Sequence, residues 1–247
     1  MAFMRFNALQ PPFDNPKLRQ ALLPAIEQTD YLRAMMGNDQ SLWSECPAFF
    51  SCGSTYESKA GAEVLTGPRD LAHAKRLIAE SGYKGERIVI LSPTDFPLIN
   101  QQSLITQDLF KRLGLSVELA AADWGTVVAR RASKEPVDKG GWSIIHTWFG
   151  AADMTNPAIH PTLRGNGANG WFGWPISARF EALREQWFAA TTPEALQRLG
   201  ADMQREAFDF LPYIPLGRFF QPTAIRSSVT GVGEGPIFFF WNVDKQG

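Results

Sequence analysis

A strand, a helix and a second strand follow one another between residues 86 and 120. The apolar run ERIVIL at 86–91 predicts a buried strand, and LSVELA at 115–120 predicts another. Between them, residues 99–113 carry apolar side chains at helical spacing and end before Gly114. A crossover of this length favours a right-handed connection between parallel strands. The chain is therefore predicted to have a mixed α/β fold, in which helices flank a mixed sheet.

Further helices and strands are expected on either side of this unit. Residues 14–36 have apolar side chains at four-residue steps, with Asp14 as the N-cap and a kink or interruption at Pro24. Asp123 is the expected N-cap of a short helix at 124–133. The other expected elements are helices at 68–83, 178–190 and 193–211, a strand at 142–148, and a final strand pair at 211–220 and 236–243.

The composition is that of a globular chain with a buried core. Apolar residues make up 45% of the 247 residues, and the formal net charge is -1. The scattered charges of both signs argue against nucleic acid as a partner. No apolar run approaches the roughly 20 residues of a membrane-spanning helix. The first residues, MAFMRFNALQPPFDN, lack the basic and apolar regions of a signal peptide.

The two cysteines, Cys46 and Cys52, enclose five residues in SECPAFFSCGS. This spacing does not match CxxC metal motifs, and the three scattered histidines do not complete a metal site. A local disulfide fits better, with two buried thiols as the alternative; the disulfide would stabilise the fold by roughly 2 kcal/mol. Because disulfides persist in oxidising compartments, we expect an extracytoplasmic protein whose N-terminal part is missing from this chain.

Residues 147–175 have neither helical nor strand periodicity and form a long predicted loop. The loop follows a predicted strand, and ligands of open α/β sheets gather beyond the carboxyl ends of strands. Its single acid is Asp153, with aromatic residues at both ends of the loop. Such a carboxylate attracts an ammonium group, although Asp153 as a turn residue bonding its own backbone is the alternative. The tryptophans near predicted element ends are Trp43, Trp124, Trp148, Trp171 and Trp174.

Two other classes of function, an enzyme and a carbohydrate-binding module, have less support from the sequence. His146, Asp153 and His160 are spaced seven residues apart and would supply two imidazoles and a carboxylate to a metal-assisted hydrolase, but this spacing matches no ligand signature. The nucleophile-elbow, dinucleotide-binding and P-loop motifs are all absent from the sequence. A carbohydrate-binding module that stacks sugars on the tryptophans is the third alternative.

Three stretches carry a family resemblance: FNALQPPFDNPKLRQALLPAIEQ, AKRLIAESGYKGERIVIL, and FDFLPYIPLGRFFQPTAIRSSVTGV with GPIFFFWNV. Together they resemble the C-terminal half of the periplasmic peptide-binding proteins of ABC importers, family 5 of the extracellular solute-binding proteins. The resemblance implies the C-terminal lobe of a type II periplasmic-binding-protein fold at residues 8–216. It also implies that residues 1–7 and 217–247 are hinge-crossing strands, which normally join a first lobe that this chain lacks.

The resemblance implies a receptor rather than an enzyme, with no cofactor and no metal. Such a receptor closes two lobes around a peptide or a similar small polar or cationic solute and delivers it to an ABC permease. The expected location is the periplasm. Residues 236–243 would normally pack into the first lobe, so in this chain we expect them to be disordered or to pair with a neighbouring molecule.

The resemblance also implies a ligand set. In peptide-binding members, a loop of the form Trp, a few residues, Asp, three residues and Pro places its aspartate on the ligand's α-amino group. Trp148, Asp153 and Pro157 match this pattern, with a longer spacing between Trp and Asp. The strand before the loop lacks the arginines that often hold a peptide carboxylate, so amines, opines and other small polar solutes stay open. The expected ligand-binding residues are Asp153, Trp148, Trp124, Asn156, Arg164 and Trp171.

Overall fold

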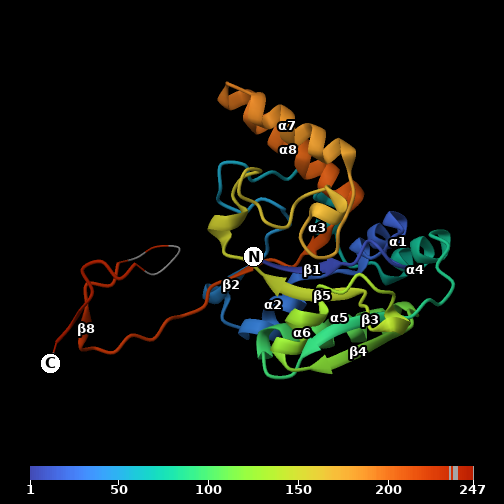
Figure 1. Cartoon of the computed structure of the whole chain (residues 1–247), viewed down its shortest axis with the longest axis horizontal. Coiled ribbons are helices and arrows are strands. Elements are labelled where there is room, and N and C mark those ends of the chain that lie inside the picture. The colour runs from blue at the N-terminus through green and yellow to red at the C-terminus, as the bar shows by residue number, and fades with distance from the viewer. Residues whose placement is uncertain (234, 236–238, 247) are drawn as a thin grey trace.

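A five-stranded mixed sheet forms the centre of the computed structural model, which describes residues 1–233, 235 and 239–246 (Figure 1). The strand order is β4-β3-β5-β1-β6. Strand β3 is parallel to β4 and β5, whereas β1 is antiparallel to both β5 and β6. The predicted mixed α/β fold and the parallel pair are therefore confirmed. The bounds are β1 (Ala2–Phe6), β3 (Ile88–Pro93), β4 (Val117–Ala122), β5 (Ile144–Trp148) and β6 (Tyr213–Pro215).

The crossover between β3 and β4 is α5 (Pro97–Leu113), as the sequence predicts. The helix ends at Gly114, whose φ of 84° is left-handed, and the Gly114 N–H bonds the carbonyls of Lys111 and Phe110. Glycine adopts this conformation without a steric penalty, so it ends the helix at this residue.

The first predicted helix is interrupted, as expected at Pro24. It consists of α1 (Pro16–Ala21), the 3-10 turn η1 (Leu23–Ala25) and α2 (Gln28–Met36). The predicted N-cap was wrong by one residue. Asn15, not Asp14, has the extended backbone of a cap, and its side chain accepts a hydrogen bond from the Lys17 N–H.

The other helices surround the sheet. The Asp123 side chain caps α6 at the Thr126 N–H, as predicted. Helices α7 and α8 pack against each other and project from the top of the molecule in Figure 1. The bounds of these remaining helices are α3 (Glu63–Thr66), α4 (Leu71–Glu80), α6 (Trp124–Arg130), α7 (Ala178–Ala189) and α8 (Pro193–Phe210). The 3-10 turns are η2 (Gln40–Leu42), η3 (Val137–Lys139), η4 (Ala151–Met154) and η5 (Gly167–Asn169).

The core has two parts: a large cluster that reaches both faces of the sheet at β1 and β6, and a smaller cluster on one face of β3 and β5. Successive residues of a strand point to opposite faces. Accordingly, Ile90 joins the large cluster that includes Phe110 of α5, whereas Leu91 joins a smaller cluster with Val127 of α6 and Trp142. The smaller cluster is bordered by the aromatic residues Trp124, Trp171 and Phe172.

Cys46 and Cys52 form the predicted disulfide, with their Cα atoms 5.9 Å apart. The ring that they close is held by hydrogen bonds from other elements. Gln28 of α2 donates to the Cys46 carbonyl and accepts from the Cys46 N–H, and Arg218 donates to the Cys52 carbonyl. Residues far apart in the sequence thus meet beside this ring.

The C-terminal strands differ from the predicted pair. The run 211–220 is divided into β6 and β7 (Arg218–Phe219) at Gly217, and β7 pairs with β2 (Trp43–Ser44). Residues 239–243, the described part of the predicted strand 236–243, form no strand, so this prediction was wrong there. Instead, β8 (Val229–Thr230) pairs with β9 (Asp244–Lys245).

The described residues after 220 form an arm that extends away from the body that contains the central sheet (Figure 1). On this arm, Phe240 is 81% exposed and Trp241 is 77% exposed. Residues 236–238, part of the segment predicted to self-associate, lie outside the described residues. Among the helices that the structure describes, none has the length and apolar character to cross a membrane.

Candidate ligand-binding site

Four aromatic side chains form a row at one edge of the central sheet. The ring centroids of Phe96 and Trp124 are 5.1 Å apart, and those of Phe96 and Trp148 are also 5.1 Å apart. Trp148 lies 5.3 Å from Phe219, with the rings perpendicular. All four side chains are half-buried, so each offers part of its ring to solvent. We call these four residues the aromatic row.

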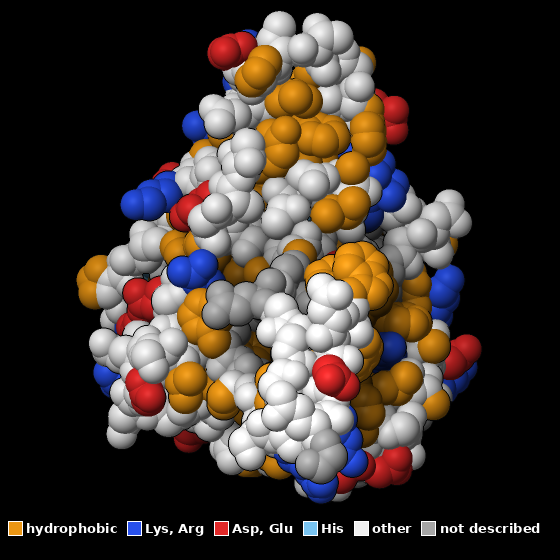
Figure 2. All heavy atoms as spheres, turned by 90° about the vertical axis from the view of Figure 1, so that its left-hand side faces the viewer, with side chains coloured by type: hydrophobic (Ala, Val, Ile, Leu, Met, Phe, Trp, Pro, Cys, Tyr) orange, Lys and Arg blue, Asp and Glu red, His pale blue; other side chains and the backbone are white. Residues whose placement is uncertain are grey.

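The topology of the sheet explains why the row forms. Strands β3, β4 and β5 are parallel, so their carboxyl ends lie at the same edge. Phe96 and Trp124 come two or three residues after β3 and β4, and Trp148 is the last residue of β5. This edge is the usual position of ligands in open α/β sheets. Figure 2 faces this end of the lobe, with the C-terminal arm toward the viewer, and shows hydrophobic side chains exposed around the arm.

Two carboxylates accompany Trp124 at this edge. The Asp95 carboxylate accepts a hydrogen bond of 2.7 Å from the Trp124 N–H and so fixes the start of α6. The Asp123 carboxylate accepts from the Thr126 hydroxyl and N–H, and these bonds lower the pKa of Asp123 below its ordinary value. The Trp124 end of the aromatic row therefore lies beside two carboxylates, those of Asp95 and Asp123.

Asp153 lies in the turn η4, shortly after β5, and its side chain is exposed. Its N–H bonds the Gly150 carbonyl, and its carboxylate lies against the Gly150 backbone, where a side chain would clash. Among the described residues, no hydrogen bond or ion pair engages the Asp153 carboxylate. The neighbouring Met154 is fully buried, and its carbonyl accepts from the Ser51 N–H, which ties the turn to the body of the lobe.

Asn156 and Trp171, two other expected ligand residues, have local contacts in the loop. The Asn156 side chain accepts from the Ala158 N–H in a turn. Trp171 is half-buried, and its ring lies 5.8 Å from that of Phe149. The guanidinium carbons of Arg5 and Arg131 lie over the Trp171 ring at 5.4 and 5.7 Å.

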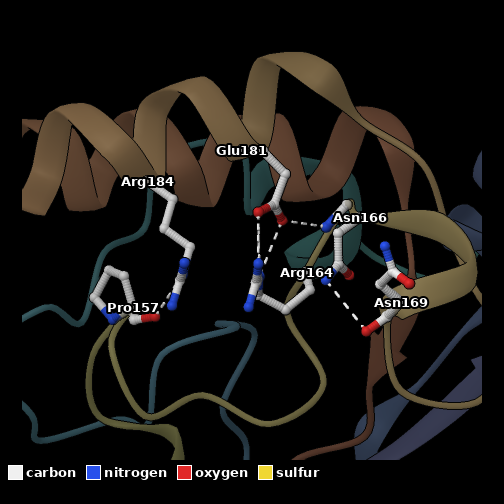
Figure 3. Close-up of polar contacts among 7 residues, drawn as sticks. Pro157, Arg164, Asn166, Asn169, Glu181 and Arg184 are labelled. Atoms are coloured by element: carbon white, nitrogen blue, oxygen red, sulfur yellow. Dashed lines mark hydrogen bonds and ion pairs between the residues drawn. The ribbon is translucent and has the colours of Figure 1, made fainter.

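Arg164 forms an ion pair with Glu181 of α7 (Figure 3). Its Nε and Nη2 atoms donate to the Glu181 carboxylate, which also accepts from the Gly165 N–H. Burial alone would raise the pKa of Glu181, but the bonds from Arg164 and Gly165 lower it below its ordinary value. Arg184, one turn further along α7, donates to the Pro157 carbonyl. These contacts attach the loop to α7.

The structure does not bring together the three residues of the hydrolase hypothesis. His146 is buried against Thr106, and His160 is buried with its Nε2 atom 3.0 Å from the Phe49 carbonyl. Asp153 is exposed and bonds neither histidine. Within the part of the chain that the structure describes, no group of three or more His, Cys, Asp or Glu side chains is arranged to hold a metal ion.

Residues 1–171 match the family described as bacterial extracellular solute-binding proteins, family 5 Middle. The chain belongs to this family. Its members are solute-binding receptors and not enzymes, which agrees with the resemblance inferred from the sequence. The chain is 36% identical over 248 residues to a probable peptide ABC transporter periplasmic-binding protein, y4tO, of Sinorhizobium fredii. It is 25% identical over 262 residues to heme-binding protein A of Haemophilus influenzae.

Solved structures show the same fold. The dipeptide-binding protein of Pseudoalteromonas sp. SM9913, in complex with Met-Leu, matches with a TM-score of 0.77 and 20% identity, over 100% of this chain and 48% of that chain. The Haemophilus influenzae OppA complex with the peptide RPPGFSPFR matches with a TM-score of 0.74 and 15% identity, over 93% and 44%. The matches to y4tO and to heme-binding protein A cover 98% and 100% of this chain and 45% of each relative. The chain thus spans about half the length of the family members it matches.

Two members of the aromatic row, Phe96 and Phe219, were not predicted from the sequence. Phe96 could have been predicted, because it follows a predicted strand and the carboxyl ends of parallel strands lie at one edge of a sheet. Phe219 could not, because its place depends on the pairing of Trp43 with Phe219 across most of the chain.

Proposed function

We propose that this chain is one lobe of a periplasmic receptor that binds a peptide or a similar small polar or cationic solute and delivers it to an ABC permease. The proposal rests on the family, and the observation that carries it is the aromatic row, which is half-exposed at the edge where α/β sheets bind ligands. The relatives are about twice as long as this chain, which leaves room for a second lobe, and closure of that lobe over this edge would cover the ligand.

The chemistry of the edge favours ligands that combine an ammonium group with an apolar side chain. Asp153 supplies an exposed carboxylate without an internal partner among the described residues, and an ammonium ion would pair with it. The rings of Trp148 and Phe96 would pack against an apolar side chain or attract the cation to their faces. We therefore assign Asp153 as the ammonium anchor and Trp124 and Trp148 as walls.

The other expected contacts have a weaker case. The Asn156 Nδ2 atom donates to the Thr155 hydroxyl at 3.3 Å, so one of its two amide hydrogens is left for a polar contact with the ligand. Arg164 is paired with Glu181, so it would have to leave this pair to meet a ligand carboxylate. A ligand held mainly by its amino end and its side chain fits this arrangement.

The proposal is tested by labelling the eight tryptophan indoles and recording their NMR signals during titration with the dipeptide Met-Leu. One lobe buries only part of a ligand, so we expect a Kd of about 1 mM or weaker and titrate to about 10 mM. The Trp124 and Trp148 signals should shift. Trp142, fully buried with its indole N–H bonded to the Arg131 carbonyl, should not shift.

Two matched experiments test the anchor and the ligand class. Asp153→Asn should weaken Met-Leu binding by about tenfold, which is the effect of losing one charged hydrogen bond. N-acetyl-Met-Leu, which has no ammonium group, should likewise bind the wild-type chain about tenfold more weakly than Met-Leu. If maltose shifts the row signals and Met-Leu does not, the carbohydrate-binding alternative replaces the proposal. If no ligand shifts them, the aromatic row is not a binding surface.

A further inference from the structure

A fully buried arginine lies under the loop that carries Asp153. Arg5 is the fourth residue of the central strand β1, and its side chain is 0% exposed. Its Nε atom donates to the Phe172 carbonyl at 2.7 Å and its Nη1 atom to the Thr162 carbonyl at 2.9 Å. Its Nη2 atom donates to the Trp171 carbonyl at 3.3 Å. All three acceptors belong to the loop at 149–175, which we call the site loop.

The partners of Arg5 are unusual for a buried charge. A buried guanidinium normally pairs with a carboxylate, yet among the described residues no Asp or Glu lies within ion-pair distance of Arg5. Its charge is instead surrounded by the three loop carbonyls and the Trp171 ring. These carbonyls are the main groups that offset the loss of water around the guanidinium. The charge therefore constrains where the loop backbone lies.

At Gly173 the backbone of the site loop lies very close to strand β1 and to Arg5. Gly173 has a φ of 96°, and its carbonyl accepts from the Ala8 N–H, just after β1. A Cβ atom at this position would lie 2.2 Å from the Phe6 carbonyl oxygen and 2.8 Å from the Arg5 Nε atom. Because the Phe6 oxygen belongs to the sheet backbone, it has little freedom to move. Any side chain at Gly173 would push the loop away from Arg5.

Hydrogen bonds link the loop segment that Arg5 holds to His160, which lies nearer to Asp153 in the sequence. The Thr162 carbonyl bonds Arg5, while the Thr162 and Leu163 N–H groups donate to the His160 Nδ1 atom. His160 in turn lies 3.0 Å from the Phe49 carbonyl. Asp153 thus lies between Trp148, fixed in β5, and a segment that begins at His160 and is fixed on β1, while the buried Met154 and its bond from the Ser51 N–H also hold the turn.

We propose that Arg5 is a positioning residue that seats the site loop on β1 and thereby sets the place of Asp153 and Trp171 relative to Trp148 and the ligand. This inference rests on the proposed function for its ligand-binding part. Arg5 contacts no ligand itself, since it has no exposed surface. Its effect comes from its forked donors, which a lysine cannot reproduce because it is a single point charge.

The chain contains a matched control. Arg19 of α1 is also buried, and it also donates to three backbone carbonyls, those of Phe13, Phe210 and Leu211. Its acceptors lie outside the site loop, beside α1 and at the end of α8. Arg5→Lys and Arg19→Lys remove the same chemistry from two different places. A general loss of stability should appear in both variants, whereas a positioning effect should appear only in Arg5→Lys.

The decisive measurement is amide hydrogen exchange in the full chain. In Arg5→Lys, the amides of 160–172 should exchange about tenfold faster relative to those of α5, since one or more charged hydrogen bonds are lost. Arg19→Lys should leave this ratio at the wild-type value. Gly173→Ala should loosen the same segment while keeping the charge, and it decides the question if Arg5→Lys does not fold. Equal ratios in the two lysine variants, or no loosening in Gly173→Ala, would overturn the proposal.

Ligand binding supplies the second readout. The Trp148 indole shift per unit of Met-Leu should fall by about fivefold in Arg5→Lys and stay unchanged in Arg19→Lys. An unchanged slope in Arg5→Lys would show that the loop contact does not set the binding site. If the wild-type chain does not respond to Met-Leu at all, the proposed function fails, and the exchange measurements still decide whether Arg5 seats the loop.

Discussion

Mild acid should destabilise this protein through two buried histidines. His146 and His160 are 2% and 3% exposed, and burial lowers the pKa of each from 6.5 to about 3. In His160 the Nδ1 atom accepts from two backbone N–H groups, so it has no room for a proton. Nearby Arg5 also disfavours a positive charge on His160. Both imidazoles are therefore neutral in the folded protein.

The direction and size of the effect follow from proton linkage. The unfolded chain binds a proton at each histidine below about pH 6.5, while the folded chain binds none until about pH 3. The stability contributed by each neutral imidazole is thus fully present above pH 6.5 and is lost as the pH falls toward 3. At pH 5.5 the loss is about 1.4 kcal/mol for each histidine, or about 3 kcal/mol for both.

Urea unfolding at pH 7.5 and 5.5, followed by tryptophan fluorescence, measures this loss. The higher of the two values lies above the histidine range, and ordinary carboxyl groups titrate mainly below the lower one. The double variant with His146→Gln and His160→Gln should lose most of the difference between the two conditions. His73→Gln, at a half-buried position of α4, should keep it. Equal wild-type stability at both pH values would refute the reasoning.

Two further predictions concern the disulfide and the core. Reduction of Cys46–Cys52 should lower the free energy of unfolding by about 2 kcal/mol, because the ring is short; a urea titration with and without reductant measures it. Phe110→Ala should cost about 3–5 kcal/mol, since the ring is fully buried, and Leu104→Ala, 43% exposed on the same helix, should change stability by about 0.5 kcal/mol or less in the same assay.

Elements governed by local chemistry were predictable from the sequence. Gly114 ends α5 and Asp123 caps α6, because each needs only its own conformational or hydrogen-bonding properties and a few neighbouring residues. The interruption at Pro24 has the same origin, since proline lacks an N–H and clashes with the preceding turn. Asp14 and Asn15 are both good caps by residue type, so the choice between them depended on the backbone angles.

Long-range contacts were not predictable. The pairing of β2 with β7 joins two-residue strands that lie far apart in the chain, and neither strand has a periodicity of its own. The apolar run at 236–243 has strand composition, yet its described part, including Trp241, is not in a strand, and the pairing described on the arm is that of β8 with β9, which engages residues 244–245 instead. Composition alone does not supply a hydrogen-bonding partner.

In the candidate site too, features set by local sequence were predictable, whereas contacts between distant residues were not. Trp148, Trp124 and Asp153 were expected as ligand contacts from the family resemblance and from their place at or shortly after the ends of predicted strands, and in the structure the rings of both tryptophans lie 5.1 Å from that of Phe96. Arg164 was expected to be free for a ligand, but its side chain lies beside Glu181, a partner 17 residues later in the chain. A sequence shows that an arginine is present, whereas the ion pair that engages it depends on how α7 packs against the loop.

Arg5 is the residue that the sequence least reveals. In MAFMRFN it interrupts an apolar run and has the pattern of an exposed side chain on an edge strand. In the structure, β1 is instead a central strand paired on both sides, so the side chain has no route to solvent. A central strand tolerates a buried charge only if other groups bond it, and here those groups are backbone carbonyls of the site loop. The loop that lacks any periodicity of its own therefore takes its shape from a charge on the sheet beneath it.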